Sequence, residues 1–141
     1  MTKLRKVFLI ISVFVFLVDR LLKIFISETT EIFLIPKILS LELYKNYGAA
    51  FGLKIPVFLI VIFSIAILVL IVIFIKKDIR KKIPHWVLLF LVLGAVSNIF
   101  DRIHYGYVVD TFNFLNISFF NLADGMIIVG LLLIFYYYRK N

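Results

Sequence analysis

The chain has 141 residues, of which 64% are hydrophobic, and it carries 16 Lys and Arg residues against 8 Asp and Glu residues. An ordinary soluble domain is about 45–50% apolar, so this composition excludes a soluble enzyme, a disordered chain and a nucleic-acid binder. The absence of cysteine excludes a disulfide scaffold, thiolate metal sites and cysteine catalysis. The composition therefore predicts one integral membrane domain that covers residues 1–141.

Four apolar segments approach or exceed the roughly 20 residues that a membrane-spanning helix requires. They cover about residues 7–22, 55–75, 83–100 and 122–138, and they predict an all-α integral membrane protein with four transmembrane helices. The first segment follows a basic start, as the apolar core of a secretory signal peptide does. However, the charged run Asp19–Lys23 stands where such a peptide would have a small-residue cleavage site, so we interpret this segment as a retained span.

The distribution of Lys and Arg predicts the orientation. The N-terminal tail, the connector at residues 76–82 and the C-terminal tail together hold 10 of the 16 basic residues. Because cytoplasmic segments carry the excess of Lys and Arg, we expect both termini in the cytoplasm and outer loops at residues 24–54 and 101–121. Alternating, β-branched and aromatic residues in these loops predict a small extra-cytoplasmic β element with a turn at Leu115–Asn116. The alternative is that these segments lie flat on the lipid headgroups.

Four aspartates are predicted close to the outer ends of these helices: Asp19, Asp101, Asp110 and Asp124. An ionisable group within a membrane is costly, and it usually marks a functional site. Asp19 has a second interpretation, in which it turns outward or pairs with Arg20 or Lys23. Asp101 adjoins Arg102, and this neighbourhood predicts a structural ion pair that caps the helix.

Asp110 and Asp124 have no adjacent basic residue, and they are therefore the candidates for chemistry. Two carboxylates brought together cannot both ionise cheaply, so one serves as a base and the other as an acid at the same pH. Such a pair can activate water for attack on a peptide carbonyl and protonate the departing amide. Other hydrolytic mechanisms lack their motifs, and His85 and His104 are predicted on opposite faces of the membrane.

Five motifs resemble, in the same order, those of the lipoprotein signal peptidases, the signal peptidase II family. They lie at Asp19–Lys23, Asn46–Gly52, Gly94–Arg102, Tyr107–Asp110 and Phe120–Asp124. The resemblance implies a membrane aspartic endopeptidase that cuts diacylglyceryl-modified bacterial prolipoproteins just before the lipidated cysteine. Two residues depart from the family pattern: Ser97 stands where glycine is common, and Gly125 where serine or alanine is usual.

The resemblance also implies roles for individual residues. Asp110 and Asp124 match the catalytic pair, and the residues expected to bind substrate or support the active site are Asp19, Asn46, Gly48, Asn98, Asp101, Arg102 and Asn121. No metal or cofactor is expected. The implied partners are a lipidated prolipoprotein, membrane phospholipid and inhibitory peptides of the globomycin type. The implied location is the bacterial cytoplasmic (inner) membrane, with the active site at its outer face.

A second function class stays open at this point, because aspartates within a membrane also relay protons in small transporters and channel subunits. The predicted aspartates gather at one face instead of following the depth of the membrane, and the sequence has no visible internal repeat, which disfavours a transporter. A purely structural membrane subunit would leave Asp124 unexplained.

The predicted topology can be tested with reporter fusions. Reporters at Lys77 and after Asn141 should indicate the cytoplasm, and reporters near Lys37 and Phe114 should indicate the outer side, because basic residues concentrate in the first group of segments. An outer location for Lys77 would contradict the placement of the four aspartates at a common face.

Overall fold

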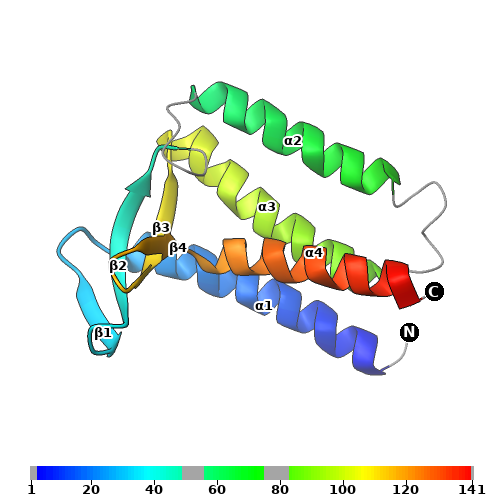
Figure 1. Cartoon of the computed structure of the whole chain (residues 1–141), viewed down its shortest axis with the longest axis horizontal. Coiled ribbons are helices and arrows are strands. Elements are labelled where there is room, and N and C mark those ends of the chain that lie inside the picture. Colours follow the sequence, from blue (N-terminus) through cyan, green and yellow to red (C-terminus); the bar gives the residue numbers. More distant parts are fainter. Residues whose placement is uncertain (1–2, 49–55, 75–82, 141) are drawn as a thin grey trace.

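The computed structural model describes residues 3–48, 56–74 and 83–140, and this part of the chain forms four helices and one small sheet (Figure 1). The elements, in chain order, are α1 (Lys3–Phe25), β1 (Glu31–Ile35), β2 (Leu39–Asn46), α2 (Val57–Phe74), α3 (His85–Tyr105), β3 (Val108–Phe114), β4 (Ser118–Phe120) and α4 (Leu122–Lys140). The sheet lies at one end of the helices, and α1 begins and α4 ends at the other end.

The four helices overlap the four apolar segments predicted from the sequence. Two of those described, α3 and α4, are long and apolar enough to cross a membrane, while α2 has a shorter apolar stretch at Val57–Ile71. The basic connector at residues 76–82 and the Ala49–Gly52 part of the second motif lie outside the described residues.

The sheet confirms the predicted β element. Its strands are antiparallel throughout and follow the order β1-β2-β3-β4. Leu115 and Asn116 have positive φ angles of 55° and 56° between β3 and β4, which confirms the predicted turn. The pairing of β2 with β3 sets Tyr44 opposite Asp110 and Asn46 opposite Val108, so the ends of two separate outer loops are held together.

Helix α3 is longer than predicted, because it continues past residue 100 to Tyr105. It ends at Gly106, which adopts a left-handed conformation with φ 79° and donates its backbone N–H group to the carbonyl of Arg102. Glycine adopts this conformation without a steric penalty, and it commonly ends a helix. Asp101 and Arg102 therefore lie on the last turns of α3, in agreement with their predicted place at the outer end of this helix.

Two glycines allow α3 and α4 to approach closely. A Cβ atom at Gly94 would lie 2.6 Å from the carbonyl oxygen of Ala123 and 2.8 Å from Cβ of Met126. A Cβ atom at Gly130 would lie 2.7 Å from Cβ of Leu91. Small residues commonly permit such contacts between membrane helices. The close approach places the start of α4 against the middle of α3, where the polar residues of both helices meet.

Substitution of Gly94 by Ala should lower the free energy of unfolding by about 1–3 kcal/mol, the usual range for overpacking. The added methyl group would meet a backbone carbonyl that cannot move without shifting α4. Gly125→Ala is the matched control, since a Cβ atom there meets nothing within 4 Å. Thermal unfolding in detergent measures both variants, and equal melting temperatures would contradict the proposed close contact.

Candidate active site

Asp110 lies on β3, and both of its carboxylate oxygens accept hydrogen bonds from asparagine side chains. Asn46, the last residue of β2, donates to Oδ2 at 2.9 Å, and Asn121 donates to Oδ1 at 2.8 Å. The sheet register explains the first contact, because Asn46 is paired with Val108 and is thus the diagonal neighbour of Asp110 on the same face. Only 1% of the Asp110 surface is exposed, so amides replace water around its carboxylate.

Asp124 lies in the first turn of α4 and forms a capping box with Asn121. The Asn121 Oδ1 atom accepts the backbone N–H group of Asp124 at 2.9 Å, and the Asp124 Oδ2 atom accepts the backbone N–H group of Asn121 at 3.2 Å. This reciprocal arrangement satisfies two N–H groups that a helix start leaves without partners. Because Asn121 also donates to Asp110, one capping residue contacts both aspartates.

Asn46 is oriented by a contact at the other end of its amide group, and a third asparagine contacts Asp124. The Asn46 Oδ1 atom accepts the backbone N–H group of Gly48 at 3.1 Å, which leaves Nδ2 to face Asp110. Asn98, on α3, donates from Nδ2 to the Asp124 Oδ1 atom at 2.7 Å. The structure thus brings together Asp110, Asp124 and the predicted supporting residues Asn46, Gly48, Asn98 and Asn121.

The environment of Asp110 changes its acidity. Burial raises the pKa of its carboxyl group from 3.8 to about 6. The hydrogen bond from Asn46 is the largest effect that lowers this pKa, and the Asn121 hydrogen bond and the charge of Lys23 act in the same direction. The nearby charge of Asp124 raises it. A carboxyl group with this pKa exchanges its proton readily near neutral pH, as acid–base chemistry requires.

Asp19 and Asp101 belong to a buried ion cluster beside this pair. The Asp101 Oδ1 atom lies 2.6 Å from Nη1 of Arg20, and its Oδ2 atom lies 2.8 Å from Nζ of Lys23. Lys23 also lies 3.1 Å from the Asp19 Oδ2 atom, which confirms the alternative that Asp19 pairs within α1. The Ser97 hydroxyl group donates to the same Asp19 oxygen at 2.6 Å and accepts a hydrogen bond from Arg20 at 3.0 Å.

The predicted ion pair between Asp101 and Arg102 is wrong. Among the described residues, the ion partners of Asp101 are Arg20 and Lys23 of α1. Consecutive residues of a helix do not face each other, so Asp101 turns toward α1 while Arg102 turns to another side of α3. Arg102 lines a cavity, and it interacts electrostatically with Asp124 and Asp110 more strongly than with Asp101.

The site residues predicted from the sequence do not include Arg20, Lys23 or Ser97. A signal for Lys23 was present in the spacing along α1, where Ser12, Asp19 and Lys23 follow one another at intervals of seven and four residues. Such intervals place side chains on one helix face, and all three are buried. Ser97 departs from the family motif, and no neighbouring residue in the sequence indicates that it contacts α1.

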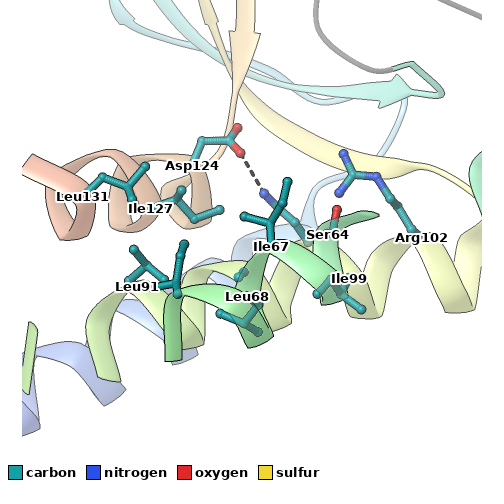
Figure 2. Close-up of a pocket in the computed structure, with 12 residues that line it drawn as sticks. Ser64, Ile67, Leu68, Leu91, Ile99, Arg102, Asp124, Ile127 and Leu131 are labelled. Carbon is teal, nitrogen blue, oxygen red and sulfur yellow. Dashed lines mark hydrogen bonds between the residues drawn. The ribbon is translucent and has the colours of Figure 1, made fainter. Parts of the chain in front are cut away.

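A cavity of about 300 Å³ opens beside Asp124 (Figure 2). Its walls come from three helices, with Ser64, Ile67, Leu68 and Ile71 from α2, Leu91, Ala95, Asn98, Ile99 and Arg102 from α3, and Asp124, Ile127 and Leu131 from α4. Most of these side chains are aliphatic. The polar lining includes Arg102 and the carboxylate of Asp124, which accepts a hydrogen bond from Asn98. The cavity can accept an apolar chain, one end of which would then lie beside the carboxylate of Asp124.

Comparison with known proteins gives consistent matches over nearly the whole chain. The family model described as Signal peptidase (SPase) II matches residues 11–139. A lipoprotein signal peptidase of Enterococcus faecalis is 36% identical, with 97% of this chain and 90% of that protein covered. A lipoprotein signal peptidase of Streptococcus agalactiae is 33% identical, with 92% and 90% covered.

Two solved structures of a bacterial membrane enzyme, determined by the in meso method, are similar to the fold. One has a TM-score of 0.79 and covers 96% of this chain and 88% of its own. The other has a TM-score of 0.77 and covers 96% and 94%. Both are 28% identical to this chain in sequence.

The pKa of Asp110 can be measured without reference to activity. The infrared carbonyl band of its protonated carboxyl group should disappear as the pH rises through about 6, and it should be missing in Asp110→Asn. In Asn46→Ala the midpoint should move to higher pH, because the hydrogen bond from Asn46 favours the ionised form and lowers the pKa. An unchanged midpoint in Asn46→Ala would contradict this contact.

Proposed function

Because the chain belongs to the signal peptidase II family, we propose that it is an aspartic endopeptidase in which Asp110 and Asp124 form the catalytic pair. Members of this family are proteases, and this protein removes the signal peptide from prolipoproteins. The observation that carries the assignment of the catalytic pair is the Asn121 side chain, which caps α4 at Asp124 and donates to Asp110. A single residue thereby holds two carboxylates together, and one of them, Asp124, lies at the polar end of an apolar cavity.

The cavity suits the chemistry of the substrate. A signal peptide has an apolar helical core, and the aliphatic walls from α2, α3 and α4 offer it apolar contacts. The peptide bond to be cut would then lie near Asp124, where the lining becomes polar. A diacylglyceryl group on the following cysteine would remain in the adjoining lipid, and cleavage would occur just before that cysteine.

The reaction follows from the protonation of the pair. The ionised carboxylate takes a proton from water, and the resulting hydroxide attacks the peptide carbonyl. The protonated carboxyl group then supplies a proton to the departing amide nitrogen. Two interacting carboxyl groups titrate as a unit, so the acid and base roles belong to the pair and not to one residue each. The pKa of about 6 for Asp110 keeps both protonation states accessible near neutral pH.

The proposal includes the placement in the membrane. The chain would form one four-helix membrane domain in the bacterial cytoplasmic membrane, with both termini in the cytoplasm and the sheet at the outer face. Phospholipid would surround the helices, and peptides of the globomycin type would inhibit cleavage. The placement of the sheet beside the catalytic pair supports this arrangement, because the prolipoprotein is cut where water reaches the membrane surface. A proton-coupled transporter receives no support from the family match.

Asp110→Asn and Asp124→Asn should each leave the protein folded but lower turnover by about 100- to 10,000-fold or more, because asparagine cannot transfer the proton. The double variant should be scarcely slower than either single variant, since the two residues act as a unit. The measurement is cleavage of a purified prolipoprotein in detergent, with lipidated and unlipidated substrate compared side by side.

Glu31→Gln is the matched control for loss of a carboxylate, because Glu31 lies exposed on β1 and should not affect cleavage. Substantial turnover in Asp110→Asn or Asp124→Asn, together with loss of activity in Asp19→Asn or Asp101→Asn, would contradict the assignment of the catalytic pair. Cleavage of unlipidated substrate at the same rate would contradict the requirement for the diacylglyceryl group.

A further inference from the structure

Lys23 is the most unusual cation in the described part of the chain, because its ammonium group is fully enclosed. Only 4% of the residue is exposed. The Ser97 hydroxyl oxygen lies 3.4 Å from the Nζ atom, and three oxygens from other side chains lie closer. These are the Asp101 Oδ2 atom at 2.8 Å, the Asn98 Oδ1 atom at 3.0 Å and the Asp19 Oδ2 atom at 3.1 Å. An ammonium group has three N–H donors, so each of these oxygens can receive one.

Each of the three acceptors leads to the catalytic pair by one further hydrogen bond. Asp19 accepts the backbone N–H group of Ala123 at 3.0 Å, and Ala123 directly precedes Asp124. Asp101 accepts the backbone N–H group of Val109 at 3.3 Å, and this residue directly precedes Asp110. The third acceptor, Asn98, donates to the carboxylate of Asp124 itself at 2.7 Å.

We propose that Lys23 is a positioning residue, which fixes the geometry of the catalytic pair through Asp19, Asp101 and Asn98. The proposal rests on the proposed function, because it takes Asp110 and Asp124 as the reacting groups. Lys23 itself does not line the cavity, so it acts on the reaction only through the residues that it holds.

The contact with Asn98 has a specific consequence for hydrogen bonding. Lysine has donors and no acceptor, so it can face only the oxygen of an amide group. Lys23 therefore fixes the Asn98 side chain with Oδ1 toward α1 and Nδ2 toward Asp124. Without the ammonium group the amide can turn over, and Asp124 would lose its donor or meet an oxygen instead. Arg20 cannot replace this contact, because its hydrogen bonds go to Ser97 and Asp101.

The charge of Lys23 also acts on Asp110. The groups that surround Asp110 are the amides of Asn46 and Asn121, the carboxylate of Asp124 and the cations Lys23 and Arg102. Lys23 lowers the pKa of Asp110, so its removal should raise that pKa. The limb of the pH–rate profile that reports this ionisation should then move to higher pH.

The test compares Lys23→Met with wild type in single-turnover cleavage of a lipidated prolipoprotein. Folded enzyme is present in saturating excess over substrate. The observed rate constant then describes the reaction in the folded enzyme and does not depend on the fraction of enzyme that is folded. We expect a fall of roughly 10- to 100-fold, the range that a displacement of about 1 Å produces at a reacting group. The pH profile should also shift to higher pH, whereas the enzyme concentration that gives half of the maximal rate constant should change little. A wild-type rate constant with a wild-type pH profile would overturn the proposal.

Lys23→Arg covers the case in which the methionine variant does not fold. Its guanidinium group keeps the charge, but the N–H donors of this group lie in one plane. They cannot point in the three directions that the N–H donors of an ammonium group take. The rate constant should fall while the pH profile moves less than in Lys23→Met, and an unchanged rate constant would refute the three-point contact. Lys6→Met is the matched control, because Lys6 is exposed at the start of α1 and should leave the rate and the pH profile unchanged.

Failure of this proposal and failure of the proposed function give different results. If Asp110→Asn and Asp124→Asn are inactive but both Lys23 variants behave as wild type, only the positioning role is wrong. If either aspartate variant retains turnover, the catalytic pair itself is wrong, and with it the role of Lys23.

Discussion

The buried charges of α1 and α3 constrain the rest of the site. Asp19, Arg20, Lys23 and Asp101 comprise two acids and two bases, so the cluster is formally neutral. Removing one partner from a buried ion pair typically costs about 3–5 kcal/mol, because the remaining charge has lost its compensation. This cost fixes how α1 lies against α3. The carboxylates of the cluster also accept backbone hydrogen bonds. Asp101 accepts one from the residue before Asp110, and Asp19 accepts one from the residue before Asp124.

Amide side chains contact one pair of aspartates and cations contact the other pair, and this difference has a chemical basis. Among the described residues, the side-chain donors to the proposed catalytic pair are Asn46, Asn98 and Asn121, whereas the cations contact Asp19 and Asp101. A cation in direct contact would strongly favour the ionised form of a carboxyl group. An amide positions the carboxyl group with a much weaker preference. The pair can thus change its protonation during a reaction while the ion cluster keeps a constant charge.

The sequence predicted those features that depend on local patterns. Apolar length located the four helices, the turn at Leu115–Asn116 was correct, and the aspartates without a basic neighbour are the two that Asn121 connects. The strand β1 is not predicted as such, because its sequence, EIFLI, has four consecutive apolar residues and no alternation of polar and apolar positions. The partner of Asp101 was also missed. Its contact with Arg20 joins residues 81 positions apart, and the rotation of α1 against α3 is not encoded in either segment alone.

Ser97 shows how the cluster accommodates a departure from the family motif. The family resemblance implies glycine at this position, whereas here a fully buried serine hydroxyl group donates to Asp19 and accepts from Arg20. Asp19 would still have Lys23 and the Ala123 N–H group if this hydroxyl were missing. The hydroxyl therefore adds to a network that is already paired. The contacts that lead onward to the proposed catalytic pair come instead from Asn98, the next residue, and from Asp101, one helical turn beyond.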